Sequence, residues 1–238
     1  MASNDRNDQV VNWLLEENQP AVRYYTLLDL LDLPSKDPEV KEAHANISKQ
    51  GWASGILKLQ KPAGYWESRN SLYQPKYTAT NWRAIVLSDL GLTSKDKRIS
   101  KTSDLFFRKW LGEDEGNIFN DEVCIVGNAA RMLTRFGYED DPRTRKLFDR
   151  LANDQKDDGG WHCFKSSSGT LDCWEGLAAF AALPRSKRSR KIQNSIERGA
   201  EFYLKRKLFE EGMQKYLPWY RFHCCVTLAS FDQGVDRN

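Results

Sequence analysis

The sequence predicts an all-α protein built from repeated helical hairpins, and three observations indicate this. Segments rich in charged residues alternate along the chain with segments rich in small and apolar residues, and no run alternates polar and apolar residues as a strand would. The pattern Q-x-x-x-G-x-W occurs twice, in QKPAGYW and QKDDGGW. The ends of the apolar segments recur every 46 residues, at Leu90-Gly91, Phe136-Gly137 and Ala182-Leu183.

The bulk composition is that of a globular protein, and we expect a single domain over residues 1–238. Hydrophobic residues make up 40% and charged residues 29% of the chain, which argues against a disordered protein. The net charge of +3 is mild, and we expect no nucleic-acid partner. The basic run 185–191 is interpreted as a solvated loop, with peripheral contact to a membrane or another phosphate-bearing surface as the alternative.

The cysteine count and the polar N-terminus predict a cytoplasmic protein with reduced thiols. Five cysteines are present, an odd number, and no secretory signal or apolar run of membrane-spanning length accompanies them. The thiols are then core residues, metal ligands or nucleophiles. They are Cys124, Cys163, Cys173, Cys224 and Cys225.

Helix start and stop signals divide the chain. We expect residues 1–8 to be frayed, residues 9–34 to form a helix pair, and residues 38–231 to form four helical hairpins. Asp37-Pro38 and Asp141-Pro142 each combine an N-cap with a proline at the first helical position.

Each hairpin pairs a charged outer helix with an apolar inner helix. The outer helices would face water, and the inner helices would pack between their neighbours. Outer helices are predicted near 38–60, 96–111, 141–155 and 190–208. Inner helices are predicted near 78–91, 121–136, 170–183 and 218–231.

The two Q-x-x-x-G-x-W copies lie where an outer helix ends. In each copy the tryptophan would bury its ring, and the glutamine would bond backbone groups left open at the helix end. The glycine permits a tight turn between the two helices. The structural residues are Gln60, Gly64, Trp66, Gln155, Gly159 and Trp161.

This pattern resembles the QW motif of squalene and oxidosqualene cyclases. The repeat over roughly 38–231 is similar to the superfamily of terpenoid cyclases and protein prenyltransferases, and the N-terminal stretch resembles small prokaryotic members. The resemblance implies a partial α/α toroid of about five hairpins, with QW-type repeats and inner helices around a central cavity. It is compatible with a chain that acts alone or as a homodimer.

The superfamily uses two catalytic schemes. Squalene-hopene-type cyclases protonate an alkene with an aspartate in a D-x-D-D-T-A segment, and the nearest equivalent here is Thr170-Leu-Asp172-Cys-Trp, with one aspartate. Protein prenyltransferases bind zinc through D-x-C and a later histidine, which match Cys173 and His223, whereas Leu171 stands where the family has aspartate. The catalytic candidates are therefore Asp172, Cys173 and His223.

The same three residues are the metal candidates, because zinc prefers sulfur, nitrogen and oxygen donors. Asp172 is adjacent to Cys173, and adjacent residues on a helix diverge by about 100°. The alternative is a packed cysteine and a hydrogen-bonded histidine with no cofactor. Both interpretations stay open at this point.

Aromatic and cationic residues gather near the starts of the inner helices, where they could bind an isoprenoid or another apolar ligand. The alternative is that the rings fill the centre of a small toroid. The arginines could bind a diphosphate or pair with Glu175, Asp89 or Glu122. The ligand-binding candidates are Trp82, Trp174, Tyr77, Tyr220, Phe222, Arg83 and Arg221, with Tyr65, Tyr73, Trp219 and Arg131 nearby.

Three functions remain open from the sequence. The first is a terpene-cyclase-like or prenyltransferase-like enzyme, with Asp172 as the acid or Cys173 and His223 as metal ligands. The second is a non-catalytic protein that holds a lipid in the same cavity. The third is a protein-interaction module that keeps only the toroid scaffold.

Overall fold

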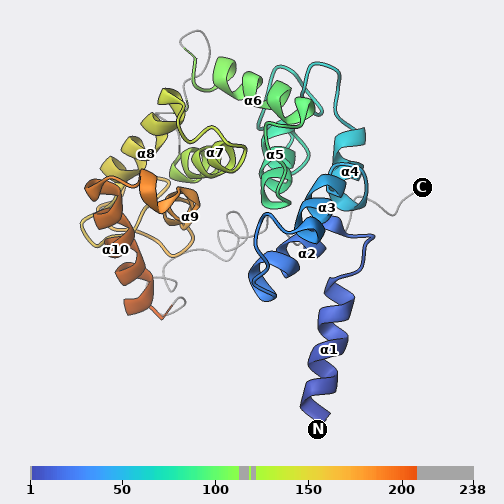
Figure 1. Ribbon diagram of the computed structural model, residues 1–238. Helices are drawn as coiled ribbons and strands as arrows, with labels where there is room; N and C mark the ends of the chain where they lie inside the picture. The colour runs from blue at the N-terminus through green and yellow to red at the C-terminus, as the bar shows by residue number, and fades with distance from the viewer. Residues whose placement is uncertain (1, 113–117, 119–121, 208–238) are drawn as a thin grey trace.

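The computed structural model describes residues 2–112, 118 and 122–207, and within these residues the protein is all-α and has no β-strand (Figure 1). One isolated backbone bridge joins Trp161 to Thr170. No helix of this described part has the length and apolar character that crossing a membrane requires. The helices are α1 (Ala2–Leu14), α2 (Pro20–Tyr25), the π-helix η1 (Thr26–Leu30), α3 (Pro38–Asn46), α4 (Gly51–Lys58), α5 (Thr80–Asp89), α6 (Lys97–Lys109), α7 (Val123–Arg135), α8 (Pro142–Asp154), α9 (Glu175–Ala182), the 3₁₀-helix η3 (Arg185–Lys187) and α10 (Arg190–Lys205).

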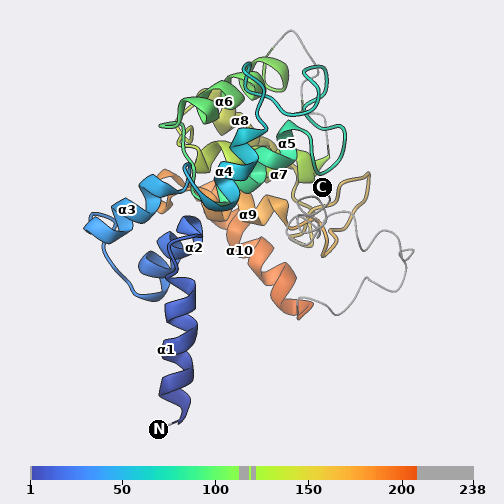
Figure 2. The same ribbon diagram turned by 90° about the vertical axis from the view of Figure 1, so that its right-hand side faces the viewer.

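Helix α1 projects from the other helices as a separate arm (Figures 1 and 2). It begins at Ala2, within the segment 1–8 that the sequence predicts to be frayed. No glycine or proline interrupts the chain before Pro20, and backbone hydrogen bonds can therefore continue through this polar segment. Trp13 on this helix is 65% exposed.

The predicted outer helix 38–60 is two helices, α3 and α4. Gly51 begins α4 with φ of +67°, a left-handed conformation that other residues rarely adopt. A Cβ atom there would lie 2.9 Å from Oε1 of Gln19 and 3.1 Å from the carbonyl oxygen of Asn18. The break at Gly51 therefore lets the start of α4 lie against the segment that leads into α2.

The predicted N-caps are confirmed. The side chains of Asp37 and Asp141 each accept a hydrogen bond from the backbone N–H two residues later, at 2.8 Å, and a proline follows each aspartate. Asp96 does the same at the start of α6, at 2.9 Å. These caps satisfy N–H groups that have no partner within the helix.

Replacing Asp141 with alanine is expected to lower the free energy of unfolding by about 1 kcal/mol at neutral pH. Hydrogen bonding from Arg143 lowers the pKa of Asp141. A carboxyl with a lowered folded-state pKa contributes stability above its unfolded pKa of about 3.9, and this contribution is lost as the pH falls through the folded-state pKa. Urea unfolding between pH 7 and pH 2 should therefore show the two proteins converging in acid. Asp141→Asn keeps the cap and should lose less stability than alanine; an alanine effect that persists at pH 2 would contradict the assignment.

The apolar helices α5, α7 and α9 are neighbours, with α7 between the other two. The charged helix α8 packs against α7 and α9, the charged helix α10 packs against α9 and α8, and α6 packs against α5 (Figure 1). Gly127 of α7 allows a close approach to α9, because a Cβ atom there would lie 2.7 Å from the backbone of Glu175. The predicted inner helix 218–231 lies outside the described residues.

The 46-residue recurrence corresponds to equivalent helix ends. Gly91 after α5 and Gly137 after α7 have φ of +88° and +93°. The residue after each glycine donates its N–H to a carbonyl five positions earlier, from Leu92 to Leu87 and from Tyr138 to Leu133, at 3.1 and 3.0 Å. Both are glycine C-caps in which the last carbonyls of the helix are satisfied.

The basic run 185–191 is largely exposed and includes η3. Lys187 lies 2.7 Å from the Asp140 carboxylate, and Arg188 donates to the carbonyl of Leu183 at 2.9 Å. Lys187 and Arg188 therefore bond other groups of the same chain, whereas Arg185 and Arg190 are exposed cations at the surface.

Candidate functional site at the start of helices α7 and α9

The two Q-x-x-x-G-x-W turns make equivalent hydrogen bonds. The indole N–H of Trp66 donates to the carbonyl of Ile56, and that of Trp161 donates to the carbonyl of Leu151, each at 2.8 Å and each across ten residues. Both rings are buried, at 1% and 0% exposure. The predicted burial of these tryptophans is confirmed, and each ring is tied to the helix that precedes it.

The glutamine of each turn donates a hydrogen bond to the outer helix that follows it in the chain. Gln60 donates to the carbonyl of Arg98 in α6 at 3.0 Å, and Gln155 donates to the carbonyl of Ser195 in α10 at 2.8 Å. The sequence predicted bonds to open backbone groups near the glutamine's own helix end. Gln155 does bond the carbonyl of Gly159 in its own turn, but the bonds that the two copies share are to the following outer helix.

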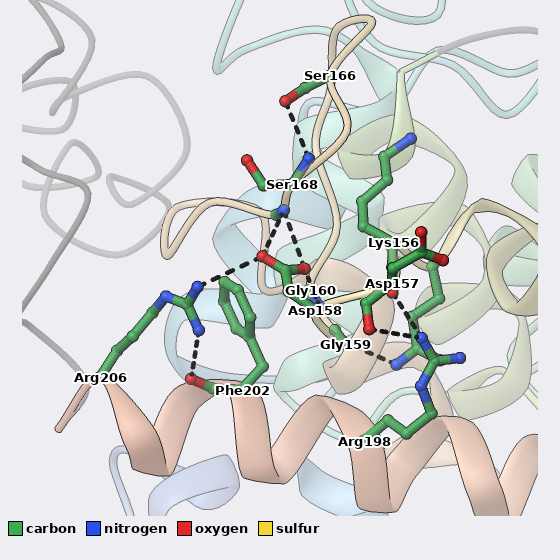
Figure 3. Close-up of polar contacts among 12 residues, drawn as sticks. Lys156, Asp157, Asp158, Gly159, Gly160, Ser166, Ser168, Arg198, Phe202 and Arg206 are labelled. Carbon is green, nitrogen blue, oxygen red and sulfur yellow. Dashed lines mark hydrogen bonds and ion pairs between the residues drawn. The ribbon is translucent and has the colours of Figure 1, made fainter.

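Hydrogen bonds and an ion pair hold the loop after the second turn against α10 (Figure 3). The Asp158 carboxylate accepts hydrogen bonds from the backbone N–H groups of Gly160 and Gly169 at 3.1 Å, and it pairs with Arg206 at 3.3 Å. Arg198 donates to the carbonyl of Lys156 at 2.6 Å. These contacts hold both ends of the loop against one helix.

This closed loop brings distant cysteines together. The N–H of Thr170 donates to the carbonyl of Trp161 at 2.8 Å, so the loop leaves and returns at the same place. Cys163 follows Trp161 and Cys173 follows Thr170, and their sulfur atoms are 3.4 Å apart. Cys173 is 2% exposed, and Cys163 is half-buried.

The start of α7 contributes a carboxylate and a further thiol to this place. Glu122 is the N-cap residue of α7, and Cys124 lies in its first turn. The Cys124 sulfur is 3.5 Å from Oε2 of Glu122. Ligand atoms of Glu122, Cys124 and Cys163 all lie within 4.8 Å of one another. We call these four residues, Glu122, Cys124, Cys163 and Cys173, the thiol cluster.

The structure places Asp172 and Cys173 in the turn before α9. The sequence predicted a helix over 170–183 that would contain both residues, and this start is wrong because α9 begins at Glu175. The bridge at Thr170 and the turn bond from the Cys173 N–H to the Thr170 carbonyl, 3.3 Å, keep this segment out of helical register. Asp172 is half-buried.

Several predicted site residues fall outside the described part of the chain. They are Trp219, Tyr220, Arg221, Phe222, His223, Cys224 and Cys225.

The aromatic residues that precede and open α5 form one cluster. The rings of Tyr73 and Tyr77 lie 5.0 and 5.1 Å from the ring of Trp82, and the Trp82 indole N–H donates to the Tyr73 carbonyl at 2.9 Å. All three are half-buried. Arg83, next to them, donates to the Thr78 carbonyl at 2.9 Å. We call Tyr73, Tyr77 and Trp82 the aromatic cluster.

Trp174 and Arg131 form a separate group between α7 and α9. The Arg131 guanidinium lies 5.4 Å from the Trp174 ring and donates to the Asp89 carboxylate at 3.0 Å. Burial raises the pKa of Asp89, while Arg131 and Arg135 oppose this rise, and burial lowers the pKa of Arg131. Of the two roles predicted for Arg131, pairing with Asp89 is the one observed.

An apolar pocket of about 250 Å³ lies between the end of α1, the start of α2 and α4. Its wall is almost wholly apolar and includes Trp13, Val22, Ile47, Trp52, Ala53 and Leu90. No part of the sequence pattern singled out this pocket, because its residues come from three separated segments. Two exposed tryptophans, Trp13 at 65% and Trp52 at 63%, mark it on the surface of the structure.

Comparison of the chain with protein-family models, curated proteins and solved structures gave no match, and the sites described above therefore stand on their own geometry.

Proposed function

We propose that the protein has the partial α/α toroid fold of the terpenoid cyclase and protein prenyltransferase superfamily, and that it binds an isoprenoid or another apolar ligand. Two features support the fold. The two Q-x-x-x-G-x-W turns make equivalent bonds to a preceding and a following outer helix. The apolar helices α5, α7 and α9 are consecutive neighbours, as inner helices of such a repeat would be.

The aromatic cluster is the observation that supports apolar-ligand binding best. Tyr73 and Tyr77 flank Trp82, and the bond from the indole N–H to the Tyr73 carbonyl fixes the ring orientation. Half-buried rings held in this way offer apolar faces at little entropic cost. Arg83 beside them lies 3.9 Å from the Glu67 carboxylate, and its guanidinium would also bind a polar head group such as a diphosphate.

Cyclisation or prenyl transfer is the catalytic form of this proposal. Asp172 would act as the acid. Turnover of prenyl diphosphates or squalene-like polyenes that is lost in Asp172→Asn would support this role. Equal turnover by the variant would remove Asp172 as the acid without touching the binding proposal.

The apolar pocket favours a second candidate, a non-catalytic protein that carries a lipid. Its volume of about 250 Å³ approaches the lower end of the roughly 300–1,000 Å³ typical of ligand sites. Trp13 and Trp52 border it, whereas the aromatic cluster belongs to α5 and the loop before it. The same class of ligand could thus bind at either place, and one pair of variants separates them.

Trp82→Ala is expected to weaken binding of farnesyl diphosphate or farnesol by tenfold or more in calorimetric titration. Loss of one buried ring face removes about 1.5–3 kcal/mol of apolar contact, and about 1.4 kcal/mol corresponds to tenfold. The matched control Trp52→Ala removes an exposed tryptophan outside the aromatic cluster and should bind as the wild type does. If Trp52→Ala weakens binding and Trp82→Ala does not, the pocket is the site. If neither probe binds the wild type, apolar-ligand binding is wrong and the interaction module is favoured.

A further inference from the structure

The thiol cluster joins two parts of the chain that no single sequence motif connects. Glu122 and Cys124 open α7, and Cys163 lies about forty residues later, in the loop that α10 fastens. A carboxylate and two thiols with ligand atoms within 4.8 Å of one another are donors that zinc prefers. We propose that Glu122, Cys124 and Cys163 bind a zinc ion.

The distances in the cluster suit tetrahedral zinc. Bond lengths of about 2.3 Å to sulfur and about 2.1 Å to oxygen place neighbouring ligand atoms of a tetrahedron roughly 3.6–3.8 Å apart. The Cys124 sulfur and the Glu122 oxygen are 3.5 Å apart, and the Cys163 atom lies within 4.8 Å of both. Small side-chain rotations would bring all three donors to one ion. Two thiolates select zinc over magnesium or calcium, which prefer oxygen donors alone.

The position of the cluster favours anionic ligands. Glu122 and Cys124 lie at the N-terminal end of α7, a helix of 13 residues, where the helix dipole stabilises negative charge. Zinc requires both thiols to be deprotonated, and the helix dipole also favours the negative charge of a thiolate. The ion and the helix end therefore stabilise the same charge state. Both cysteines are half-buried, which leaves the ion a route of entry and limits competition from water.

Cys173 acts through Cys163 as a positioning residue. Its thiol donates toward the Cys163 sulfur at 3.4 Å, and its side chain is 2% exposed. A donor to a metal-bound sulfur fixes the direction of that ligand, and loss of such a group typically costs 10–100-fold in metal affinity, by order of magnitude. The Asp158 contacts shown in Figure 3 hold the loop that carries Cys163 in place.

This site differs from the one that the family resemblance implies. The implied ligands are Asp172, Cys173 and His223, and His223 lies outside the described residues, whereas the Cys173 thiol lies 3.4 Å from the Cys163 sulfur. The group of ligand atoms found among the described residues includes neither Asp172 nor Cys173. The zinc proposal therefore does not depend on the proposed apolar ligand, and each can fail alone.

Elemental analysis and cobalt titration of the reduced full-length protein test the site. We expect close to one zinc per chain, and cobalt should give the thiolate charge-transfer and intense visible bands of a tetrahedral sulfur site. Cys124→Ser and Cys163→Ser should each weaken zinc binding by about 100-fold or more, and Cys173→Ala by about tenfold. Cys173→Ser keeps a donor and should bind more tightly than the alanine variant. Circular dichroism would establish that each variant keeps its helices.

Asp172→Asn and His223→Ala are the matched controls, and both should bind zinc as the wild type does. Zinc that survives Cys124→Ser and Cys163→Ser but is lost in His223→Ala would overturn the proposal in favour of the family-type site. A wild-type protein that binds neither zinc nor cobalt would also overturn it. One measurement needs no variant: zinc should slow alkylation of Cys124 and Cys163 by iodoacetamide, as followed by peptide mass spectrometry. Equal alkylation rates with and without zinc would contradict the site even if the variants failed to fold.

Discussion

Replacing Trp161 with alanine is expected to lower the free energy of unfolding by about 3–5 kcal/mol. The ring is fully buried, lies 6.0 Å from the Phe180 ring, and bonds the Leu151 carbonyl of α8. Gly176 in α9 and Gly199 in α10 leave the space that the ring fills, since a Cβ atom at either would lie within 3.0 Å of it. Truncation would open a cavity between three helices and leave a buried carbonyl without its donor.

Urea unfolding followed by circular dichroism measures this loss against Trp52→Ala. Trp52 is 63% exposed, so its replacement should change stability by no more than about 0.5 kcal/mol. A loss of 3–5 kcal/mol is a large share of the roughly 5–15 kcal/mol typical of folded domains, and the Trp161 variant should therefore be partly unfolded near 37 °C. Equal unfolding midpoints for the two variants would mean that the buried ring does not join α8, α9 and α10.

Gly159→Ala is expected to lower the free energy of unfolding by about 2–5 kcal/mol. Gly159 has φ of +91°, and a Cβ atom would lie 3.0 Å from the carbonyl carbon of Arg198 and closer still to its oxygen. The alanine therefore meets both an unfavourable backbone conformation and a collision with the backbone of α10, which cannot move aside as a flexible side chain would. We expect the loop that carries Cys163 to separate from α10.

Gly137→Ala separates these two contributions. Gly137 has nearly the same φ, +93°, but the nearest atom to an added Cβ is the Ser94 hydroxyl oxygen at 3.6 Å, an ordinary contact. This control should lose only the conformational part, about 1–2 kcal/mol. Thermal and urea unfolding of both variants would give the difference, and a loss at Gly159 no larger than that at Gly137 would show that the approach to α10 is not tight.

The features that the sequence predicted well are local ones. Asp37 and Asp141 cap helices because an aspartate followed by proline needs only its own neighbours to act. Trp66 and Trp161 are buried as expected because the same seven-residue pattern forms the same turn in both places. Helices α5, α7 and α8 lie within two residues of their predicted bounds because local sequence signals set where they begin and end.

The features that the sequence could not predict depend on contacts between distant segments. The break at Gly51 is set by the segment before α2, and the late start of α9 is set by the bridge between Trp161 and Thr170. The approach of Cys163 to Glu122 requires the loop to close and α7 to pack beside it. Glu122-x-Cys124 alone is too common to suggest a ligand pair, so this group was missed.

Each glutamine bonds a residue about forty positions later in the chain, so during synthesis each hairpin can be completed only after the following outer helix has been made. Gln155 finds its acceptor at Ser195, and Trp161 is covered at Gly199, so the hairpin of α8 and α9 is complete only after α10 has left the ribosome. Gln60 likewise gains its hydrogen-bond acceptor, the Arg98 carbonyl, only when α6 has been synthesised. A nascent chain that ends before α10 would lack the acceptor of Gln155 and the Gly199 surface that completes the burial of Trp161.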